Sequence, residues 1–128
     1  MELEKLNIIG LDNTYALSVV KKEFRKAVEE EWKDVPPWKR YQKKLIKELA
    51  VLEQEKEHAI DLVHFEKLTG VDRLYSIRHP ESQKNLRVIY TIFDGAIILL
   101  AVFLEKNDSD YQRVIRIAMK RLKWLDGD

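Results

Sequence analysis

Cysteine is absent from the 128 residues, so the chain offers no disulfide bond, no thiolate nucleophile and no cysteine-based metal site. Histidine occurs three times, and only His58 and His64 lie close together in the sequence. Nothing supplies the third and fourth ligands of a metal site beside them. The glycine-rich phosphate loops and the serine nucleophile motif of hydrolases are also missing. We therefore expect no metal and no cofactor.

Long apolar runs are missing as well. The longest uncharged apolar run, Ala96 to Leu104, is about half the length that a membrane helix requires. The net charge is only +1, which does not indicate a strongly nucleic-acid-binding protein. Hydrophobic residues make up 45% and charged residues 35%, the balance of an ordinary soluble domain. We expect one cytoplasmic domain over residues 1–128 that makes no contact with a membrane.

The N-terminal half predicts one strand and two helices. Loose alternation of apolar residues predicts a short first strand within residues 1–11. Apolar residues at helical spacing follow over 14–32, and Pro36–Pro37 then interrupt the pattern. A second amphipathic stripe runs over 38–57. The two helices are expected to form a hairpin over residues 14–57 that needs an apolar surface to lie on.

The C-terminal half predicts a sheet and a closing helix. Residues 72–106 have the alternation and the β-branched content of strands, and Asp94-Gly95 is a strong hairpin signal. Ser109, with a glutamine three residues later, is a capping-box pattern that opens a helix over 109–125. The predicted fold class is α+β: a curved antiparallel sheet with an N-terminal helical hairpin on one face and a C-terminal helix.

Basic and phenolic residues lie where the predicted strands end. Arg78 ends one strand and Arg87 begins the next, so both flank the same connection. The hairpin turn returns Lys106 to that end of the sheet, and Tyr111 follows in the first turn of the last helix. Fixed cations can stabilise the charge that develops on phosphorus oxygens without a metal, and a phenol can stack on a base. The alternative is that these are strand-end charges facing water.

A second basic group lies at the start of the second predicted helix. The stretch from Pro36 to Lys47 holds five basic residues and no acid. Such a run usually forms a solvated helix face, and the alternative is contact with ribosomal RNA or with a protein partner. The candidates for RNA or partner contact are Lys39, Arg40, Lys43, Lys44, Lys84 and Arg113.

The segment from Phe65 to Leu125 resembles the RelE/ParE superfamily, the toxins of bacterial type II toxin–antitoxin systems. Within that superfamily it is most similar to the HigB-like, phage Gp49-like branch. The residues that carry the resemblance are LTG-x-x-x-LYSIR at 68–78, LRVIY at 86–90, FLEK at 103–106 and DYQRVIRIAMKRL at 110–122.

The resemblance implies a metal-independent mRNA endoribonuclease, or mRNA interferase, that acts on translated messages in the ribosomal A site. In that chemistry the ribose 2′-hydroxyl attacks the adjacent phosphorus and leaves a cyclic phosphate and a free 5′-hydroxyl, which restricts the substrate to RNA. By position, Arg87 matches the arginine that holds the phosphate. Arg78 and Lys106 match basic residues on the preceding strand and at the end of the last strand, and Tyr111 lies near the C-terminal tyrosine of the family.

In the HigB-like branch a histidine, a lysine and an acid share the chemistry, which makes His79 and Asp108 candidates for proton transfer. His79 precedes a proline at a strand end, so a loop role is the alternative. Ser76 stands where the best-known ribonuclease members carry a further basic residue.

The resemblance leaves two other functions open. One is a ParE-like protein that inhibits DNA gyrase without cutting nucleic acid, and the other is an inactive phage-derived relative with the same fold. The expected partners are a cognate antitoxin, a small helix-turn-helix protein encoded next to the toxin, and the ribosome with its mRNA. Operator DNA would be contacted only through the antitoxin.

Overall fold

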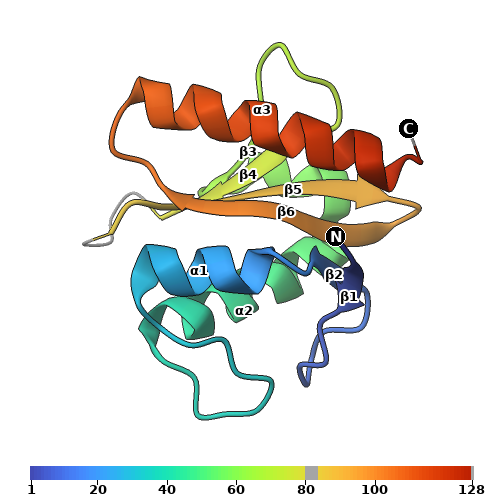
Figure 1. The fold of residues 1–128 in the computed structure, drawn as a ribbon. Helices are drawn as coiled ribbons and strands as arrows, with labels where there is room; N and C mark the ends of the chain where they lie inside the picture. The colour runs from blue at the N-terminus through green and yellow to red at the C-terminus, as the bar shows by residue number, and fades with distance from the viewer. Residues whose placement is uncertain (80–83, 128) are drawn as a thin grey trace.

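The computed structural model describes residues 1–79 and 84–127 and consists of one sheet with helices on both faces (Figure 1). In chain order the elements are β1 (Leu3–Lys5), β2 (Thr14–Leu17), α1 (Val20–Val28), α2 (Arg40–Glu55), the 3₁₀ helix η1 (Lys56–Asp61), β3 (Phe65–Lys67), β4 (Tyr75–Arg78), β5 (Leu86–Phe93), β6 (Ala96–Leu104) and α3 (Asp108–Leu125).

The six strands of the described residues lie in the order β1-β2-β6-β5-β4-β3. All neighbours pair antiparallel except β2 and β6, which run parallel. The α+β class is confirmed, and the sheet proves to be mixed rather than wholly antiparallel. The predicted hairpin turn at Asp94-Gly95 joins β5 to β6, where both residues adopt positive φ angles of 49° and 79° that suit such a turn.

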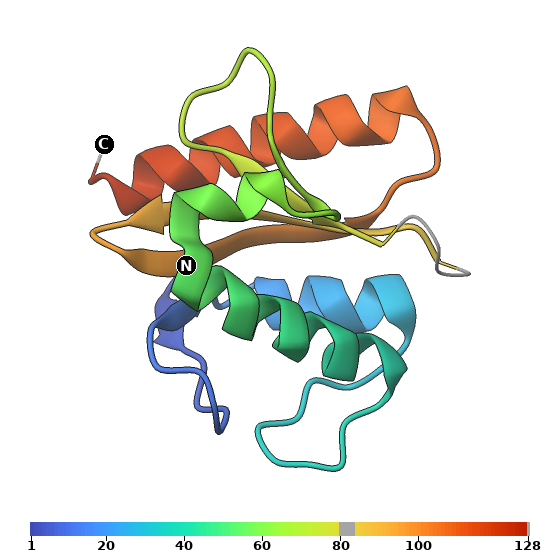
Figure 2. The same ribbon diagram turned by 180° about the vertical axis from the view of Figure 1, so that it is seen from behind.

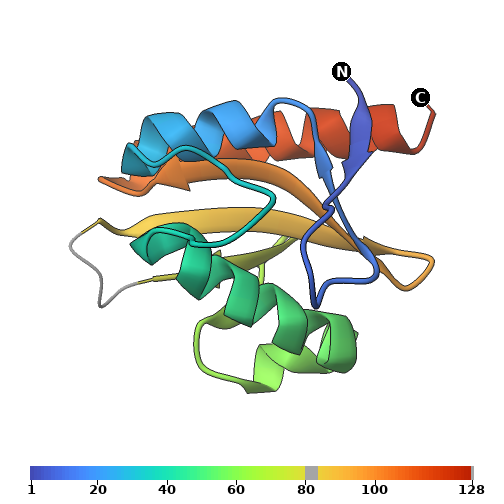
Figure 3. The same cartoon turned by 90° about the horizontal axis from the view of Figure 1, so that it is seen from below.

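The helices cover the sheet from two sides. α3 crosses one face, while α1 and α2 lie on the other (Figures 1 and 2). α1 runs along β6, and α2 lies toward β5 and β4 (Figure 3). Seven of the nine residues of β6 are buried, as expected of a central strand with both faces covered. None of the helices in the described ranges combines the length and the apolar character needed to cross a membrane.

The first predicted helix starts later than the apolar spacing indicated. Thr14–Leu17 forms β2, and the helix begins only at Val20. The backbone of this segment is used by the sheet: Leu6 N–H donates to Thr14 O at 2.9 Å, and Ile97 N–H donates to Asn13 O at 3.0 Å. Pairing with the edge of β6 therefore overrides helical periodicity. The first strand is also shorter than the predicted 1–11 segment.

The closing helix has a different N-cap from the predicted one. α3 begins at Asp108, and Asn107 is its N-cap. The Asn107 Oδ1 accepts hydrogen bonds from Asp110 N–H at 3.0 Å and from the Ser109 hydroxyl at 2.6 Å. An asparagine side chain satisfies the unpaired amides of a first turn as well as serine does, so Ser109 lies inside the helix instead of capping it.

Candidate functional site

Strand register places the two predicted arginines side by side. Arg78 of β4 is the direct cross-strand partner of Arg87 of β5. One strand further out, Glu66 of β3 is paired with Ser76 of β4. Cross-strand partners share a face of the sheet, and so do residues two apart in one strand. Glu66, Ser76, Arg78 and Arg87 consequently lie on one face, which is the face that α3 covers.

Two carboxylates hold these arginines. Arg87 pairs with Glu66 at 3.0 Å and with Glu105 at 3.3 Å, and its side chain is only 5% exposed. Arg78 lies further from the same two carboxylates, at 3.8 Å and 4.0 Å, and its side chain is 38% exposed. We name these four residues the arginine–carboxylate cluster. Its formal charges cancel, so it differs from the uncompensated group of cations expected from the sequence.

Tyr111 covers Arg87 from the side of α3. The Arg87 guanidinium carbon lies 4.4 Å from the centre of the Tyr111 ring, a cation–π contact. Burial raises the pKa of the Tyr111 hydroxyl, and the nearby Arg87 charge opposes the shift only in part. Tyr111 therefore remains a protonated phenol, able to donate a hydrogen bond, over the whole physiological pH range.

Two neutral side chains orient the carboxylates. The Ser76 hydroxyl donates to Glu66 at 3.0 Å, and the Asn85 amide donates to Glu105 at 3.4 Å. At Ser76, where the resemblance led us to expect a basic residue, the hydroxyl therefore orients a carboxylate.

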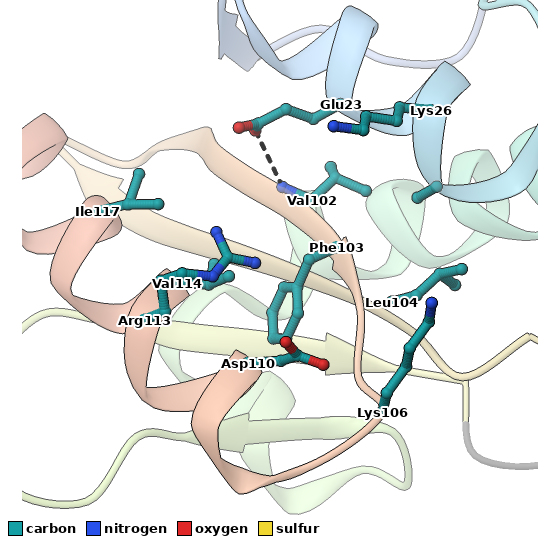
Figure 4. Close-up of a pocket in the computed structure, with 11 residues that line it drawn as sticks. Glu23, Lys26, Val102, Phe103, Leu104, Lys106, Asp110, Arg113, Val114 and Ile117 are labelled. Atoms are coloured by element: carbon teal, nitrogen blue, oxygen red, sulfur yellow. Dashed lines mark hydrogen bonds between the residues drawn. The ribbon is translucent and has the colours of Figure 1, made fainter.

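Of the six predicted catalytic residues, the structure brings together Arg78, Arg87 and Tyr111. Lys106 instead lines a cavity of about 330 Å³ between α1, β6 and α3 (Figure 4). Asp108 is exposed in the first turn of α3. Within the described residues neither of the two makes an ion pair or a hydrogen bond with the cluster.

His79 faces the opposite side of the sheet. It is fully buried, and its Nε2 is hydrogen-bonded to a carboxylate oxygen of Glu48 in α2. The reason is the alternation of a strand: Arg78 points toward α3, so its neighbour points toward α2. The geometry fits a link between the end of β4 and α2, as in the loop alternative, rather than proton transfer at the cluster.

Glu66 and Glu105 were missed by the sequence reasoning. Glu66 lies in β3, a strand of three residues within a segment that has no clear period. Glu105 directly follows β6, next to Lys106, which the sequence pattern favoured as the functional residue at this strand end. The signal that could have found them is register, because it determines which acids of neighbouring strands share a face with the arginines.

The predicted RNA- or partner-binding residues are spread over the other side of the molecule and the flank of α3. Lys39 and Lys43 are exposed at the start of α2, where the Arg40 guanidinium lies 5.3 Å from the Tyr41 ring. Lys84 joins this group, because its N–H donates to the Tyr41 hydroxyl at 3.1 Å and its ammonium lies 3.5 Å from Glu29. Lys44 is half-buried on the same helix, and Arg113 is exposed on α3.

A second cavity, of about 470 Å³, adjoins the cluster. The segment from Glu66 to Val71 forms one side of it, and α3 forms the other with Tyr111 and Gln112. The cavity is therefore lined both by Glu66 of the arginine–carboxylate cluster and by Tyr111, which covers that cluster. In the described part of the chain, no three His, Asp or Glu side chains are arranged to hold a metal ion.

Residues 30–123 match the family described as "Phage derived protein Gp49-like (DUF891)". Comparisons with curated proteins and with solved structures gave no significant match. The matched segment begins just after α1, extends into the last turn of α3, and contains the whole arginine–carboxylate cluster together with Tyr111. The chain therefore belongs to the Gp49-like phage-derived family of the RelE/HigB-like toxin group, which points to the toxin of a toxin–antitoxin system.

Proposed function

We propose that the protein is a type II toxin that cuts mRNA on the ribosome without a metal. The observation that carries the proposal is the arginine–carboxylate cluster beside Tyr111: Glu66, which lines a cavity and can accept a proton, pairs with two arginines. Membership of a toxin family supports the biological role. The chemistry rests on the cluster.

The proposed reaction is attack of the ribose 2′-hydroxyl on the adjacent phosphorus. Glu66 accepts the hydroxyl proton, the new O–P bond closes a 2′,3′-cyclic phosphate, and the bond to the 5′-oxygen breaks. Glu66 suits this role because it lines the 470 Å³ cavity and its side chain is 35% exposed. Arg78 stabilises the charge on the phosphorus oxygens, since it is the more exposed and more weakly paired arginine. Tyr111 can donate its proton to the leaving 5′-oxygen.

Substrate binding requires an exchange of partners in this scheme. The phosphate replaces a carboxylate at Arg78, where the contacts of 3.8 Å and 4.0 Å are long. Arg87 keeps its two short pairs and positions Glu66 and Glu105. Arg87 is then a positioning residue rather than the phosphate-holding residue that the family resemblance implies.

A second candidate is a toxin without nuclease activity, such as a gyrase inhibitor. The burial and full charge compensation of Arg87 favour it, because a phosphate gains little from a cation that already has two anionic partners. Both candidates share the proposed partner, a small antitoxin encoded beside the toxin. Only the nuclease engages the ribosome and mRNA.

Induced expression without antitoxin, followed by primer extension on a translated message, tests the proposal. We expect codon-phased cuts, with a loss of about 10²–10³-fold in Arg78→Ala and about 10²–10⁴-fold in Glu66→Gln. Lys21→Ala is the matched control, because Lys21 pairs with Glu4 and belongs to α1, on the face of the sheet opposite α3. Growth arrest with intact mRNA and inhibited supercoiling by gyrase would select the second candidate instead.

A further inference from the structure

The outer edge of β6 is only partly covered. β2 pairs with it over Ile97–Leu99, and in the described part of the chain no strand covers that edge beyond Leu99. The remaining edge, from Leu100 to Leu104, lies between α1 and α3 (Figure 1). The cavity of about 330 Å³ that Lys106 lines is located at this edge. We name it the β6 groove: β6 forms its floor and the two helices form its walls (Figure 4).

Backbone groups of β6 point into this groove. Val102 N–H donates to the Glu23 carboxylate of α1 at 3.2 Å, so it faces away from β5. In a strand the N–H and C=O of one residue point the same way, and the direction repeats every second residue. The C=O of Val102 and both backbone groups of Leu104 therefore face outward too. Among the described residues none of these three has a hydrogen-bond partner.

Side chains protect the part of the edge nearest β2. Arg121 of α3 donates to Leu100 O at 2.7 Å and pairs with both oxygens of Glu23 at 2.9 Å. The Glu23–Arg121 pair thus links the two walls and caps two edge positions. Beyond it, the edge over Val102–Leu104 remains a template for one further strand.

The rim of the groove is cationic. Lys26, Lys106 and Arg113 surround it, all three are exposed, and none has an ion pair among the described residues (Figure 4). Among the described residues that line the groove, Asp110 is the one acid outside the Glu23–Arg121 pair. The walls between these charges are apolar, with Ala27 on α1 and Val114 and Ile117 on α3. Acidic side chains alternating with apolar ones complement such a groove.

We propose that the β6 groove binds an extended, acidic segment of a protein partner, which adds to the sheet as a strand along Val102–Leu104. A peptide fits better than RNA, because the free groups form a ladder of backbone donors and acceptors in strand register. A second copy of this chain fits poorly, because it would bring a like-charged rim to the same place. The proposal is independent of nuclease activity.

The test is a titration of the full-length, ¹⁵N-labelled protein with a blocked octapeptide of alternating glutamate and valine. We expect the Leu104 amide to shift and its hydrogen exchange to slow at least about tenfold at saturation, because it gains a ladder partner. Two matched peptides serve as controls. One replaces glutamate by lysine, and the other is N-methylated on every amide and therefore cannot donate a hydrogen bond to the β6 carbonyls. Both are expected to leave Leu104 unprotected.

Charge reversal on α1 tests the rim. Lys26→Glu is expected to weaken binding of the glutamate–valine peptide about tenfold, because it reverses a charge at the groove wall. Arg25→Glu makes the same charge change on the same helix outside the groove and should leave affinity within about twofold. The proposal would be overturned if the lysine peptide bound as tightly as the glutamate peptide, or if the chemical shift of the Leu104 amide did not change on titration. It would also be overturned if light scattering showed that the protein self-associates and that this association protects Leu104.

Discussion

Replacing Arg87 by alanine should destabilise the fold strongly, although Arg87 lies in a candidate functional site. Its guanidinium is 5% exposed and pairs with both Glu66 and Glu105. Removing one partner of a buried ion pair costs about 3–5 kcal/mol, because the remaining charge stays desolvated. The two carboxylates keep 35% and 20% exposure, so water compensates them in part. We expect the low end, about 3 kcal/mol of unfolding free energy.

Arg78→Ala provides the matched comparison. It removes the same type of side chain from the same two carboxylates, but at 3.8 Å and 4.0 Å and from a half-exposed position. Exposed pairs contribute about 0–1 kcal/mol, so the cost should stay below about 1 kcal/mol. A triple variant, Arg87→Met with Glu66→Gln and Glu105→Gln, removes the unpaired charges and should recover much of the stability lost in Arg87→Ala.

Urea unfolding followed by tryptophan fluorescence measures all three differences. Equal costs for Arg78→Ala and Arg87→Ala would refute the argument, because burial and pairing distance would then have no effect. A loss of toxicity in Arg87→Ala has to be interpreted together with this result. Arg78→Ala and Glu66→Gln are the cleaner tests of chemistry.

Two further predictions concern caps elsewhere in the fold. Glu53 accepts hydrogen bonds from Thr14 and from the Asp12 and Asn13 amides; burial pushes its pKa upward, but these bonds outweigh burial and leave the pKa below its ordinary value. A carboxylate whose pKa is lower in the folded state than in the unfolded state stabilises the fold fully when the pH is above its unfolded-state pKa. That stabilisation is lost as the pH falls through its folded-state pKa. Glu53→Gln should therefore cost about 1–2 kcal/mol at pH 7, with the difference from wild type shrinking below about pH 4 in urea titrations. Asn107→Ala should cost about 1 kcal/mol in the same assay by removing the N-cap of α3, whereas Asn107→Asp should change stability by only a few tenths.

Much of the fold could be predicted from local pattern. The turn at Asp94-Gly95, the buried strand after it and the closing helix follow from turn chemistry and periodicity, and all are present. Thr14–Leu17 could not be assigned in this way, because its strand conformation depends on β6, which is distant in the sequence. β3 is too short to show a period and becomes a strand only by pairing with β4.

The candidate site could be predicted in part. Arg78 and Arg87 were expected to meet because they flank one connection, and register brings them together. The sequence could not reveal that Glu66 and Glu105 neutralise the two arginines. This depends on which acids the neighbouring strands bring to the same end of the sheet. His79 was expected beside Arg78 because the two are adjacent in the sequence. Adjacent residues of a strand point to opposite faces, so His79 lies on the other side of the sheet.

The parallel pairing of β2 with β6 also constrains when the molecule can form. Thr14 can meet Ile97 only after the residues between them have left the ribosome, so the sheet cannot be completed while residues 14–97 are still being made. The hairpin of β5 and β6 is local and can assemble first, whereas closure over β2 must overcome the entropy of a long loop. A newly made chain is therefore expected to lack its complete sheet until β6 has emerged from the ribosome.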